Sequence, residues 1–363
     1  MLTTRNNVVS VRPEIIAGIR AAKTGPDLYQ YLQSAIELEH ATIPPYLTAL
    51  FSIAPNTNQM VAQIIRSVVQ QDMLHMTIAA NVLNAIGGAP TMNQPGFIPT
   101  FPGPLPMSVD GGLIVGLAPL TLNLIETVFM RIELPETPQN FPVRAQLVAD
   151  QGFNTIGAFY DAIIAQIRVL GDGIFTGNPA LQVVDNVWFP ADQLFPVTNA
   201  DTAIQGLTVI KTQGEGTSTD PLDSRVQPAH YYRFEEIVKG YRLVKDPSVE
   251  QGYSFSGPPV PFDPTTVINL VSNSTISDYE PGSLAFAGVQ QADYIYTSLL
   301  NALQQTFSGN PGNLSTTLAL MYELKLVVQE AVVNQQLTSG PNAGKFAAPS
   351  FQFTPTAAAA LAA

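Results

Sequence analysis

Two long stretches of helical periodicity, separated by a few turn-forming residues, constrain the fold of this chain most. Residues 27–53 carry apolar side chains at helical spacing behind Asp27, a residue type that caps helices. Residues 59–86 repeat the pattern and stop at a Gly-Gly pair. Because the Pro-Asn-Thr-Asn turn at 55–58 is short, we expect the two helices to pack as antiparallel neighbours.

Both apolar stripes are interrupted by polar side chains near their middle. Glu39 lies in the first stripe, and Asp72 and His75 lie in the second. A carboxylate and an imidazole three residues apart on a helix project from the same face, so both can reach one metal ion. Burying a carboxylate is costly unless it is paired or bound to a cation. The chain has only 16 Lys and Arg residues, which makes a metal ion an attractive partner.

The rest of the chain predicts an all-α protein, an up-down helical bundle. Prolines crowd residues 89–118, which predicts a long crossover instead of a helix. Helical periodicity returns in five further segments, at residues 120–133, 153–170, 201–213, 228–240 and, as a C-terminal helical hairpin, 289–337. We therefore divide the chain into an N-terminal arm (1–26), a metal-binding bundle (27–240) and a C-terminal part packed on it (241–363).

Composition narrows the classes of partner. The formal net charge is −12, from 28 acidic and 16 basic residues without a basic run, so we expect neither nucleic acid nor a membrane surface as partner. There is no cysteine, so oxygen and nitrogen must hold any metal. A signal peptide and a membrane span are not evident, and we expect a cytoplasmic protein. Homo-oligomerisation stays open.

All three histidines lie near carboxylates in predicted helices, and this favours a carboxylate-bridged di-metal site. Such a site takes a Glu from each of two helices of a bundle and a Glu-x-x-His pair from each of the other two. Asp72 with His75 would be one pair in a shortened form, and Glu215 with His230 the other if the polar insertion between them loops out. The predicted metal ligands are Glu39, Asp72, His75, Glu126, Glu215 and His230.

Alternatives exist for two of these ligands. Glu37 forms a Glu-x-x-His motif with His40, although its stripe is polar and is expected to face solvent. His40 itself is either a neighbour of the metal ligands or a structural residue. Glu133 competes with Glu126, although its place at a helix end is more typical of a local cap or ion pair.

Other chemistries have little support in the sequence. There is no Gly-x-Ser-x-Gly, no phosphate-binding loop and no His-Glu-x-x-His motif. Four tyrosines are candidates for redox neighbours of the metal, although aromatic packing is the more frequent role of each: Tyr46, Tyr160, Tyr231 and Tyr232. Tyr160 is the candidate catalytic residue among them. The catalytic residues are otherwise not indicated.

Two motifs resemble a known family. The sequence AIELEHATIPPYLTAL at 35–50 and the sequence DMLHMTIAANVLNAIGGAP that starts at Asp72 resemble the ferritin-like domain family related to the violacein-pathway iminophenyl-pyruvate dimer synthase. Shorter segments extend the similarity over roughly residues 27–240: FMRIELPE (129–136), TIGAFY (155–160), QGEGT (213–217) and HYYRFEEI (230–237).

The resemblance implies a ferritin-like bundle and, in many members, an acid and histidine set suited to two iron ions, with manganese or a mixed pair as alternatives. By position it marks the predicted ligands, with either Glu126 or Glu133 on the intervening helix. The chain departs from the pattern at Asp72, where Glu is expected, and at Ala158, where an acidic residue would be unsurprising.

The function expected from this resemblance and from the ligand set is that of a non-haem di-iron oxidase or oxygenase. Its substrates would be dioxygen and a small apolar or aromatic metabolite, in secondary metabolism. The alternative is a non-catalytic ferritin-like protein that binds metal or serves in structure or assembly.

Overall fold

The computed structural model describes residues 13–108, 113–135, 155–217 and 220–354. Helices dominate this part of the chain, and its sheet consists of two short antiparallel strands, β1 (Val244–Lys245) and β2 (Tyr253–Ser254). The predicted all-α class is therefore confirmed. Short 3-10 helices occupy the connections, at Pro26–Leu28, Pro95–Phe97, Pro106–Ser108, Asp172–Ile174, Pro179–Leu181, Pro264–Thr266, Ile276–Asp278 and Pro311–Asn313.

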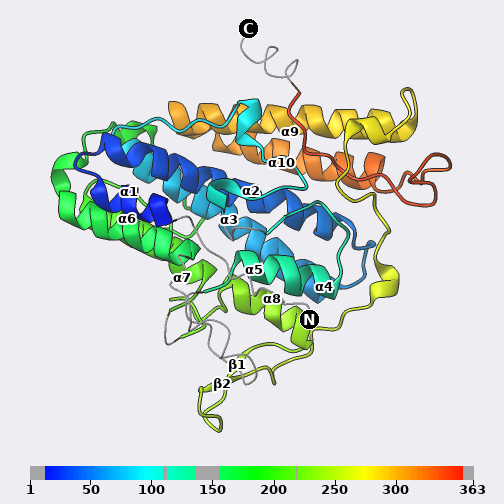
Figure 1. Ribbon diagram of the computed structural model, residues 1–363, viewed down its shortest axis with the longest axis horizontal. Helices are drawn as coiled ribbons and strands as arrows, with labels where there is room; N and C mark the ends of the chain where they lie inside the picture. Colours follow the sequence, from blue (N-terminus) through cyan, green and yellow to red (C-terminus); the bar gives the residue numbers. More distant parts are fainter. Residues whose placement is uncertain (1–12, 109–112, 136–154, 218–219, 355–363) are drawn as a thin grey trace, which may run out of the picture.

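The centre of the bundle is the antiparallel pair α2 (Tyr29–Phe51) and α3 (Gln59–Ala85), which lie side by side in Figure 1. Their apolar stripes face each other and are buried, as the periodicity predicts. α3 ends where Gly87 takes a left-handed conformation (φ 89°), which lets the N–H of Gly88 reach the carbonyl of Leu83 at 2.9 Å.

The opposite wall of the bundle is built from broken helices. α4 (Leu122–Leu124), a π-helical turn (Ile125–Phe129) and α5 (Met130–Ile132) form one continuous segment in place of the regular helix predicted at 120–133. α7 (Ala200–Gly214) and α8 (His230–Lys239) form the next. The described residues between them (215–217 and 220–229) form no helix, and α7 and α8 contact each other.

Two further helices cover one end of the bundle. α1 (Pro13–Ala21) packs on α6 (Ile156–Leu170), which in turn packs on α7. α6 starts where the side chain of Thr155 accepts a hydrogen bond from the N–H of Ala158 at 3.1 Å. The sequence predicts a start at residue 153, which lies outside the described residues.

The predicted C-terminal hairpin consists of α9 (Leu284–Ser308) and α10 (Leu314–Val327), with a final π-helical turn (Val328–Val332). Figure 1 shows it, yellow to orange, along the bundle beside α2 and α3. One continuous core of buried side chains extends from the N-terminal helix into this hairpin. None of the helices in the described part combines the length and apolar character needed to cross a bilayer.

The segment after the hairpin is fastened to α9 through one buried carboxylate. The hydroxyl of Ser350 donates to Asp293 at 2.6 Å, and the N–H of Gln352 donates to it at 3.0 Å. Burial raises the pKa of Asp293 to about 6, because the charged form loses hydration that these two donors do not fully replace.

Candidate metal centre

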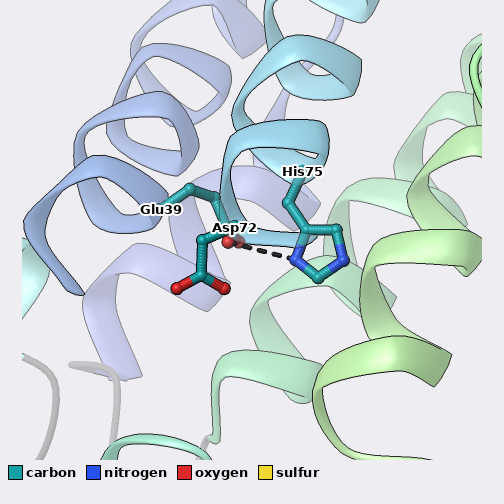
Figure 2. Close-up of side chains that lie close together, drawn as sticks. All are labelled: Glu39, Asp72 and His75. Atoms are coloured by element: carbon teal, nitrogen blue, oxygen red, sulfur yellow. Dashed lines mark hydrogen bonds and ion pairs between the residues drawn. The ribbon is translucent and has the colours of Figure 1, made fainter. Parts of the chain in front are cut away.

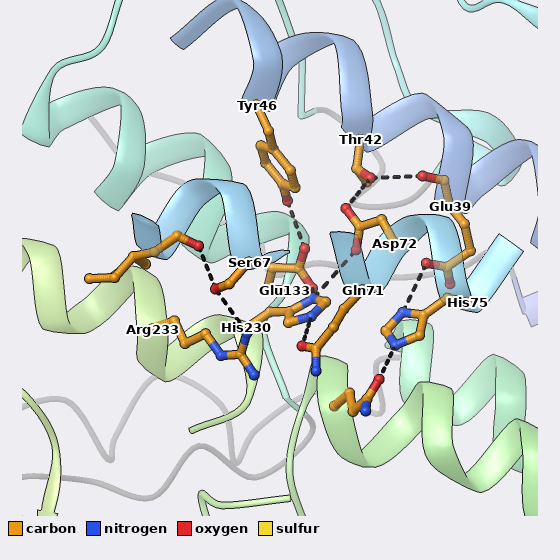
Figure 3. Close-up of polar contacts among 12 residues, drawn as sticks. Glu39, Thr42, Tyr46, Ser67, Gln71, Asp72, His75, Glu133, His230 and Arg233 are labelled. Atoms are coloured by element: carbon orange, nitrogen blue, oxygen red, sulfur yellow. Dashed lines mark hydrogen bonds and ion pairs between the residues drawn. The ribbon is translucent and has the colours of Figure 1, made fainter. Parts of the chain in front are cut away.

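Five buried side chains from four parts of the chain meet in the middle of the bundle. Glu39 of α2 lies with Asp72 and His75 of α3, and Asp72 also lies with Glu133 and His230. In each group of three, one ligand atom per residue lies within 4.8 Å of the others. Figure 2 shows the first group and Figure 3 shows both. Asp72 therefore belongs to both groups and lies between them.

Helix geometry explains how these side chains reach the centre. The antiparallel pairing of α2 and α3 places Glu39 and Asp72 at a similar height. Glu133 is the residue that ends α5, and His230 is the first residue of α8. The segment that precedes Glu133 therefore ends at the centre, and α8 begins there. Both residues point their side chains inward from a helix end.

Each histidine is oriented by a glutamine on its far side. The Nε2 atom of His75 lies 2.9 Å from Oε1 of Gln213, and Nε2 of His230 lies 2.9 Å from Oε1 of Gln71. An amide oxygen only accepts hydrogen bonds, so in this assignment each Nε2 carries the proton. Second partners of this kind fix the tautomer and orientation of metal-binding histidines.

The other nitrogen of each histidine then faces carboxylate oxygens. Nδ1 of His75 lies 3.3 Å from Glu39 Oε2, and Nδ1 of His230 lies 3.5 Å from Asp72 Oδ1 and 3.5 Å from Glu133 Oε2. Lone pairs and carboxylate charges that point at one another repel unless a cation or a proton lies between them. This donor set fits bound metal cations.

Burial and the close approach of like charges also shift the pKa values of the groups in this centre. Burial raises the pKa of Asp72, and the charges of Glu133 and Glu39 add to the shift. Burial raises the pKa of Glu133 to about 7. The pKa of His230 is lowered by burial and then by the neighbouring His75, so this imidazole stays neutral. The centre therefore combines neutral imidazoles with carboxylates whose charge is only partly compensated. Both are groups that bind metal ions in proteins.

A small cavity of about 30 Å³ lies among these side chains. This volume holds about two water-sized spheres, which is also room for two metal ions. Glu215 is buried and lines the cavity, and its Oε1 accepts the backbone N–H of Gly157 at 2.5 Å. A Cβ atom at Gly157 would lie 2.1 Å from Glu215 Oε2, so only glycine leaves room for this carboxylate.

We therefore expect Gly157→Ala to displace Glu215 from the cavity. The loss of this carboxylate should lower metal retention, whereas the free energy of unfolding should change by less than about 1 kcal/mol, because the displaced group is the end of a flexible side chain and alanine favours α6. Metal content per chain and urea unfolding measure the two effects. Gly173→Ala is the matched control, because Gly173 is exposed and nothing lies within 4 Å of its added Cβ. Equal behaviour of the two variants would contradict the packing argument.

Two tyrosine hydroxyls complete the wall of the centre. Tyr160 donates to Glu39 Oε1 at 2.5 Å, and Tyr46 donates to Glu133 Oε1 at 2.7 Å. The pKa of each is raised well above its ordinary value, first by burial and then by the negative carboxylates. Both tyrosines therefore keep their protons and present them to the carboxylates. Both tyrosines are among the four that the sequence offers as neighbours of the metal, and the structure places these two against the carboxylates.

The structure corrects the prediction for Glu126. Its side chain is exposed, and it lies outside both groups, whereas Glu133 is buried within one of them. The physical reason is the π-helical turn at Ile125–Phe129, which inserts one extra residue per turn and shifts the face of everything after it. The predicted ligands that the structure brings to the cavity are Glu39, Asp72, His75, Glu215 and His230.

Glu37 and His40, the alternative residues considered near Glu39, lie outside the two groups of candidate ligands. Glu37 is half-buried and accepts a hydrogen bond from Gln33 at 3.2 Å. His40 is buried against Phe97, with Nε2 at 2.8 Å from the hydroxyl of Tyr296. Sequence reasoning missed Gln71 and Gln213, the partners of the two histidines. Their position next to Asp72 and two residues before Glu215 was a usable signal.

Comparisons with known proteins agree with this architecture. The family model described as Ferritin-like matches residues 32–239, more than half of the chain. A solved structure of a ferritin-like protein from Caulobacter vibrioides has 26% sequence identity and a TM-score of 0.55, and the match covers 89% of this chain and 98% of that one. No curated protein matches the chain.

Proposed function

Because the chain belongs to the ferritin-like family, we propose that it is a non-haem di-iron oxidase or oxygenase. The observation that carries the proposal is the position of Asp72 in both groups of candidate ligands. The proposed ligands are Glu39, Asp72, His75, Glu133, Glu215 and His230. Two iron ions, when bound, would supply dioxygen binding and the electrons for its reduction, and manganese also suits this oxygen and nitrogen donor set.

The residues around the proposed ligands have separable tasks. Gln71 and Gln213 hold the imidazoles so that Nδ1 points into the cavity. Tyr46 and Tyr160 hold protons at the carboxylates they contact. Burial of the whole set excludes bulk water, which strengthens each electrostatic contact.

The substrate class is part of the proposal. We propose a small apolar or aromatic metabolite, and a relation to the iminophenyl-pyruvate dimer synthase rests on the two long motifs at 35–50 and 72–90. The competing function is metal binding without turnover. The size of the cavity supports it, because about 30 Å³ leaves no room for an organic molecule beside the ligands unless side chains move.

Anaerobic loading with iron(II), followed by desalting and exposure to dioxygen in the presence of a chemical reductant, tests the proposal. We expect two iron ions retained per chain and repeated consumption of dioxygen. A zinc-loaded sample is the control and should consume none. Retained iron with no more than one uptake of dioxygen would favour metal binding without turnover. A chain that retains no iron contradicts both functions.

A further inference from the structure

A second, much larger cavity lies outside the metal centre. Its volume is about 1020 Å³, and it lies between α3 and the hairpin of α9 and α10. It contains none of the proposed metal ligands, but Gln71, the partner of His230, is among the residues that line it. The cavity is therefore separate from the metal centre and in contact with it through one side chain.

Apolar side chains from every surrounding helix line this cavity. Leu47 comes from α2, Leu74 from α3, Leu303 from α9 and Leu318 from α10. Ligand cavities of about 300 to 1,000 Å³ with apolar walls and a few polar groups bind organic molecules in proteins. The volume suits a molecule with an apolar body of several to many carbon atoms.

The charged residues that line the cavity are mostly basic, whereas the chain as a whole is acidic. Four are basic, namely Arg66, Arg225, Arg233 and Lys325, and among the described lining residues Asp223 is the one carboxylate. The whole chain, by contrast, has 28 acidic and 16 basic residues. Basic side chains gathered at one cavity of an acidic protein attract an anion.

Two of these cations are free to meet a ligand. Arg66 of α3 and Lys325 of α10 are exposed, and the described part of the chain gives neither an ion pair. Arg225 is 3.9 Å from Asp192, a long contact between exposed side chains. Arg233 is buried and donates to Ser67 and to the carbonyl of Pro228. The available positive charge therefore comes from helices on both sides of the cavity.

Aromatic and polar groups add two further features. Trp188 and Tyr322 line the cavity with 48% and 54% of their surface exposed, and their ring centroids are 6.5 Å apart. Nδ1 of His40 is buried and has no hydrogen-bond partner within the described residues, and His40 lines the same cavity. Exposed aromatic rings are typical of a ligand entrance, and an unpartnered buried nitrogen favours a polar group on the ligand.

We propose that this cavity binds an amphipathic organic acid. Its apolar body would lie among the leucines of the four helices, and its carboxylate would lie near Arg66 and Lys325. Charge complementarity favours this occupant over a neutral lipid or a second copy of the chain, whose surface carries the same excess of negative charge. The proposal does not depend on bound metal.

Titration with decanoate, monitored by Trp188 fluorescence and by calorimetry, tests the proposal on the full chain. Trp188 is the single tryptophan of the sequence and lines the cavity, so its emission reports on this site. We expect saturable binding of one decanoate per chain, with and without iron, and weaker binding of the neutral analogue 1-decanol. Absence of saturable binding, or equal binding of 1-decanol, would overturn the proposal.

Charge variants locate the carboxylate. The double variant Arg66→Gln, Lys325→Gln should bind decanoate about tenfold more weakly, the effect of losing two exposed ion pairs. Lys239→Gln, Lys245→Gln is the matched control, because it removes two exposed charges outside the cavity and should bind like the wild type. Equal loss in both double variants would show that net charge alone matters and would contradict the assignment.

A cavity-filling variant locates the apolar body. Leu303→Trp should prevent decanoate binding, and circular dichroism establishes that the variant is folded. Unchanged binding by a folded variant would overturn the site. Sedimentation tests whether a second copy of the chain occupies the cavity instead. If the wild type is a dimer that Leu303→Trp converts to a monomer, the cavity belongs to an interface between copies and the ligand proposal is wrong.

Discussion

Asp72→Asn should empty both metal positions, which makes it the most damaging of the single substitutions. The side chain of Asp72 lies in both groups of candidate ligands, whereas the other four residues of those groups each lie in one. Asparagine has nearly the same shape and keeps the acceptor for the Thr42 hydroxyl at 2.8 Å, so the loss is one of charge. We expect less than one iron ion per chain after anaerobic loading, against two for the wild type, measured by elemental analysis.

Glu133→Gln and Glu126→Gln form a matched pair for the same measurement. Glu126 lies within the π-helical turn and Glu133 follows the same helical segment, but Glu133 is buried at the centre and Glu126 is exposed. We expect Glu133→Gln to lose one of the two ions, with an affinity loss beyond the roughly 10- to 100-fold typical of residues that only contact the ligands. Glu126→Gln should retain both ions. The reverse pattern would contradict the placement of the π-helical turn.

Replacement of Asp293 should change how stability depends on pH. The pKa of this buried carboxyl is about 6 in the folded chain, against 3.8 for its ordinary value. Between these two values the folded state binds more protons than the unfolded state, so the free energy of unfolding of the wild type falls as the pH rises. The total loss above pH 6 is about 3 kcal/mol.

Asp293→Asn removes this titration and keeps an acceptor for the N–H of Gln352. Relative to the wild type, we expect the variant to gain about 2 kcal/mol between pH 4 and pH 7, measured by urea unfolding at fixed metal content. Asp201→Asn makes the same change at an exposed position of α7 and shows how much of the pH-dependent difference comes from the lost charge alone. A flat difference for Asp293→Asn would contradict the raised pKa.

Periodicity was sufficient to predict the central helix pair and the burial of three polar side chains on it. Glu39, Asp72 and His75 interrupt apolar stripes, and an apolar stripe faces the core in almost any compact arrangement. The choice between Glu126 and Glu133 was beyond this argument, because seven residues are almost two full turns of an α-helix. The π-helical turn contains Glu126 and precedes Glu133, and this departure from a regular helix places Glu133 inside and Glu126 outside.

The residues carried by α7 and α8 show a second limit of prediction from sequence. Glu215 and His230 are fifteen residues apart, and only the return of the chain between α7 and α8 brings both to one cavity. Their pairing followed from the need for a second pair of one carboxylate and one histidine, and not from spacing. The glutamines behind the histidines were not predicted, because an uncharged polar residue in a helix is read first as surface.

The break between α7 and α8 also affects how the candidate metal centre is held together. Glu215 ends α7 and His230 begins α8, so the two donors are carried by separate rigid bodies, whereas Asp72 and His75 share one uninterrupted helix. One half of the centre is therefore preorganised on the helix pair, and the other half depends on the docking of two short helices.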